Sequence, residues 1–393
     1  MPLARVRESA DRSLGHSACG RVRTSITDRE IPMKHRVVQF GTGFVGHFAL
    51  RAIIDHPDLE LAGVWVHSDE KVGLDAGDIA GTARTGVLAT QDLESLLALD
   101  ADCFCSAAGG DGREEWMTEV HTRILEAGHN IVSSSIVGMV DPDSHPDNAL
   151  SQRLGEAARK GGVSYFTSGI EPGFMSDTLP LTITGLSHYW HSIRVQEILD
   201  YSTYIPSETE KIMGDILGFG RSIDDPPLLF APGRLKYVWG GPITLMARGL
   251  GIQLDEVREV SERYPARESF EVDRLGRIEE GTAEAIRFEL QGILDGHEVI
   301  VLEHVTRLRP ESAPDWPHGE FGAGYYVTVE GDPGMRCHMT CVGPDGDHHS
   351  GGILATGTRL VNAIPAVCAA EPGTISSLDL PVLPGRNLYR RPS

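Results

Sequence analysis

One segment near the beginning of this chain sets the architecture of its first half: RVVQFGTGFVG, at residues 36–46. Residues 36–40 form a short apolar run that predicts a β-strand. Three glycines follow at the spacing G-x-G-x-x-G, and apolar side chains then recur at helical spacing from Val45 to Ile53. A strand, a glycine loop and a helix in this order are typical of a Rossmann unit that binds a nicotinamide dinucleotide.

Each glycine of the loop has an expected role in holding such a ligand. Gly41 permits the tight turn, Gly43 lets the pyrophosphate approach the backbone, and Gly46 lets the helix press against the strand. The free N–H groups at the start of the helix would then bind the phosphates. An ordinary glycine turn is the alternative, and the flanking strand and helix favour the binding loop. The cofactor contacts expected here are Gly41, Thr42, Gly43, Phe44, Val45 and Gly46.

Outward from this segment, predicted strands and helices alternate as far as residue 169, which indicates a parallel, doubly wound sheet. Further strands are expected at residues 59–67, 87–90, 101–107, 130–135 and 163–167, and helices at 91–99, 113–127 and 149–160. In the helix at 113–127 we expect Trp116, Val120, Ile124 and Leu125 to face inward.

The pattern changes after residue 185 and predicts a second domain of the α+β class, built on an open antiparallel sheet with one polar face. Strands are expected at residues 193–199, 283–290, 299–308, 325–330 and 335–342, a helix at 206–219, and a loop at 224–242. Asp295-Gly296 is a hairpin signal, and Asp332-Pro333-Gly334 joins a second hairpin. A last helix at 357–370 is expected to pack back near the Rossmann domain.

These patterns divide the chain into four expected parts. Residues 1–32 carry many arginines but also several acids, which favours a disordered extension over a transit peptide. Residues 33–170 form the dinucleotide-binding domain, and residues 171–350 form a domain for substrate binding and dimerisation. Residues 351–393 supply the C-terminal helix and a tail that packs on the first domain.

The composition excludes several classes of function. The 393 residues carry a formal net charge of −21, and so acidic a surface repels nucleic acid and anionic lipid. No apolar run approaches the roughly 18 residues of a membrane span. The six cysteines are scattered and suggest no disulfide framework, which favours a cytoplasmic protein. We expect a small-molecule substrate, with neither a nucleic acid nor a membrane as partner.

The end of the second predicted strand bears on the choice of cofactor. An NAD-preferring site usually places an acid there to bind the ribose 2′-hydroxyl. In this chain His67 and Ser68 occupy that place, with Lys71 close behind. These groups suit a 2′-phosphate and favour NADP, with NAD as the alternative if Asp69 binds the ribose and Lys71 is merely solvated.

The fourth and fifth predicted strands end in small residues, which leave room for a nicotinamide ring at the ligand edge of the sheet. Simple packing of helices on the sheet would also explain them. The cofactor contacts expected at these ends are Ser106, Ala107, Ala108, Ser134 and Ser135. Cys337, His338 and Cys341 have no second ligand pair at a suitable spacing, so we expect a buried pair of thiols and no metal site.

Four further segments carry a resemblance to a known family. They are VGLDAG at residues 72–77, SGIEPGFMSD at 168–177, GDHH at 346–349 and TRLVNAIP at 358–365. Together with the glycine loop, they resemble the dihydrodipicolinate-reductase-like family, and within it the 2,4-diaminopentanoate dehydrogenases and native amine dehydrogenases. The resemblance implies an NAD(P)-dependent oxidoreductase acting on an amine or ketone, and a homodimer. It also implies that residues 169–177 line the crevice between domains and that the helix of Asn362 closes it.

The chain departs from the amine dehydrogenase pattern at two places. Residues 135–138, after the fifth strand, contain no acid where that pattern has acids, and Glu171 stands where it has an asparagine. Hydride transfer to an imine or carbonyl needs a proton-handling group, and Glu171 is the first candidate. Its alternative role is to cap the helix that follows. Tyr204, with Tyr201 near it, and His348 are the other candidates.

A reductase or dehydrogenase of another C=N or C=O substrate is the alternative enzyme. A dinucleotide sensor without turnover is the alternative from a different class, and the large second domain favours the enzyme.

Overall fold

The computed structural model describes residues 34–110, 112–144, 149–204, 210–273, 275–319 and 323–391. The chain from Lys34 onward forms one compact unit. The expected disordered extension at residues 1–32 lies outside the described residues.

The first sheet has seven strands, all parallel, in the order β15-β6-β5-β4-β1-β2-β3. Its central strands are buried on both faces, as expected of a parallel sheet covered by helices. The predicted doubly wound Rossmann architecture is therefore confirmed. Its strands are β1 (His35–Phe40), β2 (Leu59–Trp65), β3 (Ala89–Thr90), β4 (Cys103–Ser106), β5 (Asn130–Ser133), β6 (Ser164–Thr167) and β15 (Gly373–Ile375).

The helices of this half follow the predicted alternation. They are α1 (Phe44–Asp55), α2 (Ala76–Ala80), α3 (Leu93–Leu97), α4 (Glu114–Glu126) and α5 (Ala149–Gly161). In α4 the prediction for Trp116 is wrong, because its side chain is exposed and Met117 is fully buried in its place. Val120, Ile124 and Leu125 face inward as predicted.

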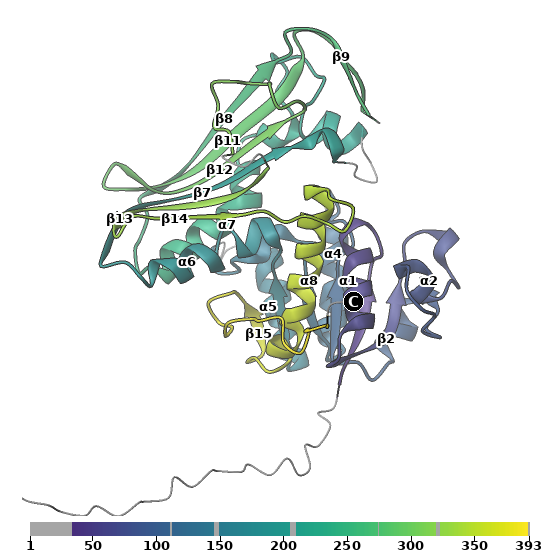
Figure 1. Cartoon of the computed structure of the whole chain (residues 1–393). Helices are drawn as coiled ribbons and strands as arrows, with labels where there is room; N and C mark the ends of the chain where they lie inside the picture. The colour runs from purple at the N-terminus through teal and green to yellow at the C-terminus, as the bar shows by residue number, and fades with distance from the viewer. Residues whose placement is uncertain are drawn as a thin grey trace, which may run out of the picture. The chain divides into compact units, whose positions relative to one another are not determined.

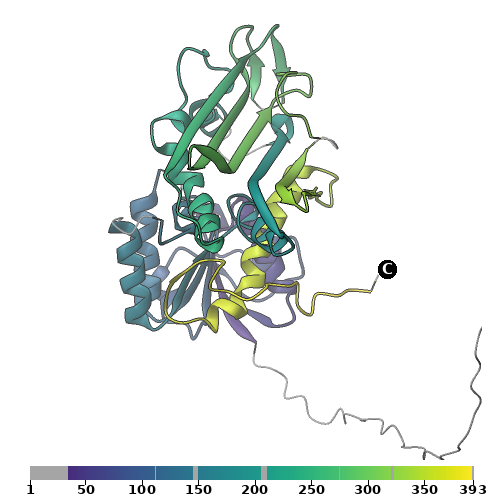
Figure 2. The ribbon, with the colours of Figure 1, turned by 90° about the vertical axis from the view of Figure 1, so that its left-hand side faces the viewer.

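The C-terminal part of the chain returns to this sheet, where α8 (His348–Cys368) runs beside α1 (Figures 1 and 2). A Cβ atom on Gly357 would lie 3.0 Å from the backbone nitrogen of Ala49, so a glycine permits the close contact. Residues 373–375 then add β15 to the edge of the sheet beside β6. The sequence pattern predicts this helix with a start nine residues too late, and β15 is too short to show a pattern.

The second sheet has six strands in the order β14-β13-β7-β12-β11-β8 and is mixed. The prediction of an antiparallel sheet is corrected at one place, because β7 and β12 pair in parallel. A separate two-stranded sheet pairs β10 with β9. The strands are β7 (Tyr189–Asp200), β8 (Glu256–Pro265), β9 (Phe270–Val272), β10 (Gly276–Ile278), β11 (Ala283–Leu294), β12 (His297–Arg307), β13 (Gly324–Asp332) and β14 (Met335–Met339).

One long helix of this half was not predicted. Residues 224–242 were expected to form a loop, but α7 (Arg234–Gly249) covers the second part of that range and packs on β11, β12 and β8. Its Gly-Gly-Pro sequence is unusual inside a helix. Burial of Leu235, Ile243 and Met246 against the sheet outweighs that local preference. The predicted helix at 206–219 lies partly outside the described residues, and its remainder contains a helical turn at Glu210–Ile216.

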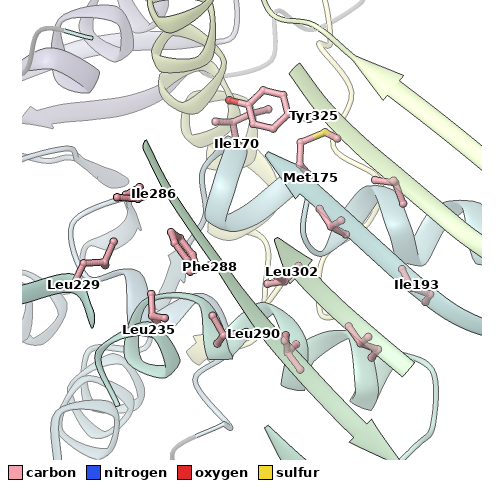
Figure 3. Packing of buried hydrophobic residues seen from close by; sticks show 14 of the residues in the cluster. Ile170, Met175, Ile193, Leu229, Leu235, Ile286, Phe288, Leu290, Leu302 and Tyr325 are labelled. Atoms are coloured by element: carbon pink, nitrogen blue, oxygen red, sulfur yellow. The ribbon is translucent and has the colours of Figure 1, made fainter. Parts of the chain in front are cut away.

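The apolar core of the second half lies between α7 and one face of the sheet (Figure 3). Ile286, Phe288 and Leu290 of β11 point into it, as their alternation predicted. Leu302 of β12 and Ile193 of β7 belong to the same cluster. Between β6 and this sheet stand the turn Ile170–Phe174, which carries Glu171 of the candidate site, and α6 (Thr178–Thr184).

Candidate active site

The glycine loop between β1 and α1 has the geometry that a dinucleotide needs. Gly41 has a φ of +91°, and a Cβ atom there would lie 2.7 Å from the nitrogen of Ala108. A Cβ on Gly46 would lie 2.1 Å from the carbonyl oxygen of Gly41, whereas a Cβ on Gly43 would meet nothing within 4 Å. Gly43 is the N-cap residue of α1, and no side chain forms a capping hydrogen bond with the start of this helix. The open side of Gly43 and the uncapped helix start therefore fit a bound pyrophosphate.

The residues after β2 place one cation against this loop. The Nζ atom of Lys71 donates a hydrogen bond to the carbonyl oxygen of Thr42 at 3.0 Å. His67 is exposed and Ser68 half-buried beside it. The side chain of Asp69 accepts a hydrogen bond from Gln91 at 2.9 Å, so this acid already has a partner. A positive group beside the loop suits a phosphate on the ribose.

The small residues at the ends of β4 and β5 lie in two different environments, the protein interior and the lining of a cavity. Ser106 is fully buried, and its hydroxyl lies 2.8 Å from Nε2 of His121 and 3.2 Å from the hydroxyl of Ser135. The hydroxyl groups of Ser106 and Ser135 therefore have hydrogen-bond partners inside the protein. Ala107 and Ala108 lead away from β4, and Ala108 packs under Gly41. Ser134, which follows β5 between the buried Ser133 and Ser135, lines a cavity.

A cavity of about 350 Å³ extends from the first turn of α1 to α7. Its walls come from the ends of β5 and β6, from residues near β7, and from α7 and α8. Its lining combines polar and apolar side chains. Lining residues include Val45, Ser134, Thr167, Gly169, Glu171, Tyr201, Tyr204, Ile212, Leu229, Arg234, Val238, Trp239, Ile353 and Thr356.

Glu171 is the carboxylic acid of this cavity. The backbone around it is held by α8, because the hydroxyl of Thr356 accepts a hydrogen bond from the N–H of Ile170 at 3.2 Å. The Glu171 side chain is 1% exposed, and neither carboxylate oxygen has a hydrogen-bond partner among the described residues. Burial raises its pKa to about 8, and the nearby Ser176 hydroxyl and Asp177 carboxylate change that pKa less, in opposite directions.

The alternative role of Glu171 as a helix cap does not fit this geometry. The helix that follows, α6, begins at Thr178, and its cap is the Asp177 side chain. Glu171 is instead a buried acid that borders a cavity, with no hydrogen bond to its carboxylate oxygens among the described residues, and such an acid is suited to proton transfer.

The other two candidates from the sequence have separate positions. Tyr204 lines the cavity with Glu171, and its ring lies 4.7 Å from that of Tyr201. His348 does not join them. It is the first residue of α8, and its Nε2 atom lies 3.0 Å from the carbonyl oxygen of Asp200, beside a different hollow. The expected convergence of His348 with Glu171 is therefore corrected, because the start of α8 turns its ring toward the end of β7.

Sequence reasoning missed two ionisable residues beside Glu171. Nε2 of His304 on β12 lies 3.5 Å from Glu171, and Nδ1 of the same ring lies 3.7 Å from Glu197 on β7. Both residues stand on the inward faces of their strands. The sequence did contain one signal for Glu197. Ile193, Val195 and Glu197 alternate at a period of two, so the Glu197 side chain points to the same face of the strand as these two apolar residues.

The described residues contain no group of three or more side chains suited to holding a metal ion. The five cysteines in the described ranges are free. Cys337 and Cys341 are only half-buried, which corrects the expected buried pair of thiols. Among the described helices, none is long and apolar enough to cross a membrane.

Comparison with known proteins assigns the chain to a family. Residues 174–387 match the model of the 2,4-diaminopentanoate dehydrogenase C-terminal domain. An amine dehydrogenase of Streptomyces virginiae is 41% identical over 353 residues, which is 88% of this chain and 96% of that protein. A 2,4-diaminopentanoate dehydrogenase of Acetoanaerobium sticklandii is 24% identical, covering 89% of this chain and 94% of its own length. This chain belongs to the 2,4-diaminopentanoate dehydrogenase family.

A solved structure shares the fold over almost the full length. The amine dehydrogenase of Mycobacterium smegmatis superposes with a TM-score of 0.69 at 21% identity, covering 90% of this chain and 97% of that one.

Membership of this family makes the chain an NAD(P)-dependent oxidoreductase of the amine dehydrogenase type. A nicotinamide cofactor suits the glycine loop and the cavity that begins at Val45. When bound, that cofactor supplies or accepts the hydride. The resemblance implied that residues 169–177 line the crevice, and Gly169, Glu171 and Pro172 do line the cavity. From α8 the lining residues are Ile353 and Thr356, whereas Asn362 faces another hollow beside α1.

Proposed function

We propose that this enzyme transfers a hydride between NADP and a small amine, or the corresponding ketone, and that Glu171 handles the proton. The observation that carries this proposal is the buried carboxyl group of Glu171, which has no hydrogen-bond partner among the described residues and borders a cavity that also reaches the start of α1. In related amine dehydrogenase sequences we expected an acid after the fifth strand, and this chain has none there. Glu171 supplies an acid from the neighbouring strand end.

The state of Glu171 suits both directions of such a reaction. With a pKa near 8 the carboxyl group is mostly protonated at neutral pH, so it can donate a proton to the oxygen that leaves a carbinolamine as water. The resulting carboxylate then stabilises the positive charge of the iminium carbon–nitrogen bond that accepts the hydride. In the oxidative direction the same carboxylate takes a proton from the attacking water.

The walls of the cavity suggest the class of substrate. Leu229, Val238, Trp239 and Ile212 give the cavity apolar lining, and its volume of about 350 Å³ suits a small molecule. Arg234 lies at the wall but is paired with Glu114 at 3.4 Å. We therefore propose an amine or ketone with an apolar substituent.

Tyr204 is proposed as a wall of the same site. Its ring lies 6.1 Å from Phe44, at the start of α1, and 5.0 Å from His349 of α8. It therefore borders the path from the glycine loop to Glu171.

Three broader proposals accompany this one. The polar outer face of the second sheet carries Arg194, Glu289 and Glu303 in a network of ion pairs. This face supports a homodimer, and light scattering should then give the mass of two chains.

The free cysteines support a cytoplasmic location. The boundaries 33–170, 171–350 and 351–393 remain our proposed domain limits.

A screen of ketones tests the function directly. Each ketone is incubated with the enzyme and NADPH, once with ammonia and once without, and NADPH oxidation is followed by absorbance. We expect oxidation only where ammonia is present, with apolar ketones preferred. Oxidation without ammonia would assign the enzyme to carbonyl reduction, and tight cofactor binding with no oxidation of any kind would assign the protein to dinucleotide sensing.

A further inference from the structure

Four side chains stand in one row across the second sheet. The strand register pairs Phe288 with His304, His304 with Glu197, and Glu197 with Tyr325. All four point to the face that bears the apolar core, where Figure 3 shows Phe288 and Tyr325. Glu171 reaches this row from the end of β6. The sheet thus places a histidine between two buried carboxyl groups.

The contacts within this row are close but leave room for adjustment. Glu171 Oε1 lies 3.5 Å from His304 Nε2, and Glu197 Oε1 lies 3.7 Å from His304 Nδ1. Both distances are slightly longer than a hydrogen bond, and such gaps in enzymes without substrate commonly tighten when the substrate binds. The His304 ring is held in place because it stacks on Phe288, with ring centres 4.6 Å apart and planes at 10°. Trp239 contacts both of these rings, and its centre lies 4.8 Å from that of His304 with the planes at 56°.

Burial keeps these groups in the forms that exchange protons. It lowers the pKa of His304, so the ring is neutral near pH 7, with one N–H and one lone pair. It also raises the pKa of Glu197 to about 7. The electrostatic interaction with His304 lowers this pKa, and the interaction with Glu171 raises it further. Two carboxyl groups with pKa values near neutrality thus flank an imidazole that can both accept and donate.

We propose that Glu171, His304 and Glu197 form a proton relay: in the oxidative direction Glu171 passes the proton that it takes from water through His304 to Glu197, and in the reductive direction Glu197 returns it. The inference rests on the proposed role of Glu171. When Glu171 holds the proton, His304 carries its proton on Nδ1 and Glu197 is ionised. Transfer moves the Glu171 proton to Nε2 and the Nδ1 proton to Glu197. One carboxylate exists before and after the step, so the buried charge does not change.

Other ionisable groups face the relay from every neighbouring element. The ones nearest to the two glutamates are tyrosines whose pKa burial raises well above 10, so they stay neutral. Glu303 acts on His304 from the opposite face of β12, and Asp177 acts on Glu171 but is balanced by Arg359. The groups that face the relay are Asp177, Tyr201, Arg234, Glu303, Tyr325 and Cys341.

The variant Glu197→Gln tests the relay, because glutamine keeps the shape of the side chain but cannot take the proton from Nδ1. We expect kcat to fall about 10- to 100-fold, while the KM for ketone and the Kd for cofactor stay within about twofold. The pH profile of kcat should lose the ionisation near pH 7, and Glu197→Asp should restore part of the rate. If Glu197→Gln does not fold, His304→Gln breaks the same chain at its centre and should give the same losses.

Two comparisons separate this inference from the function on which it rests. Val195→Ala removes packing from the same face of β7 without touching an ionisable group, so it should lower the melting temperature and leave the pH profile unchanged. Glu171→Gln should abolish most turnover. If Glu171→Gln is inactive while Glu197→Gln or His304→Gln has the wild-type kcat and pH profile, the relay is wrong and the proposed function stands. Full activity of Glu171→Gln would overturn the role of Glu171 itself.

Discussion

Glu171 owes its chemistry to its surroundings. A glutamate in water ionises near pH 4.5, and the same carboxyl group, buried without a hydrogen-bond partner in the part of the chain that the structure describes, has a pKa of about 8. The penalty for burying a charge is the cause, since desolvation disfavours the ionised form. A residue that looks like a helix cap in the sequence thus becomes an acid able to donate a proton at neutral pH.

Lys71 carries the prediction about cofactor choice. Its ammonium group already touches the glycine loop through the Thr42 carbonyl, where a 2′-phosphate would add a charge-assisted hydrogen bond. We expect Lys71→Ala to raise the Kd for NADP about tenfold and the Kd for NAD less than threefold, as measured by fluorescence titration. Equal weakening of both cofactors would show that Lys71 only holds the loop and that the preference for NADP has no basis in this residue.

The junction between β1 and α1 allows two neighbouring glycines to be distinguished. Gly43→Val places a side chain in open space, so the melting temperature should stay within a few degrees while cofactor binding is lost. Gly46→Val forces a Cβ to within 2.1 Å of the Gly41 carbonyl oxygen, so it should unfold or strongly destabilise the protein. Calorimetry with and without NADP measures both effects. Retained binding in Gly43→Val would contradict the assignment of the loop.

The second sheet brings together ionisable side chains from distant parts of the sequence. Glu197 and His304 are more than a hundred positions apart, yet the parallel register of β7 and β12 makes them direct neighbours. A shift of one residue in that register would turn one of the two side chains to the other face of the sheet. The apolar residues on both sides of each position hold the register, and the charged pair depends on them.

For the protein as a whole, the buried acids link stability to pH. The folded state holds the Glu171 proton up to about pH 8, whereas the unfolded chain releases it near pH 4.5. The free energy of unfolding should therefore fall as the pH rises between these values, by about 5 kcal/mol from this group. In Glu171→Gln this loss of stability disappears. The free energy of unfolding of the variant, relative to that of the wild type, should therefore rise between pH 5 and pH 9.

Denaturant unfolding of both proteins across this pH range measures the difference. The two curves should approach each other at pH 5, where Glu171 is protonated in the folded state and carries no charge to remove. Parallel curves at all pH values would show that Glu171 is ionised in the folded protein, against its burial.

Most of the first half of the molecule was predictable from the sequence. Rossmann strands are short apolar runs separated by periodic helices, and this local pattern placed β1, β4, β6 and α1 within about two residues of their ends. The second half was less predictable, because α7 contains glycines and a proline that its packing outweighs, and β15 is only three residues long. Local preference is a weak guide where burial in the core supplies the larger free energy.

The glycine loop, the doubly wound sheet and the candidate acid Glu171 follow from the order of residues alone, because backbone conformation and hydrophobic periodicity are local properties. The partners of that acid do not. His304 and Glu197 lie on strands that read as ordinary sheet, and only the pairing of β7 with β12 and the approach of the turn at Ile170–Phe174 bring them to Glu171. Burial and the distances between charges arise when segments far apart in sequence pack together, and these two quantities set the pKa values on which the proposed chemistry depends.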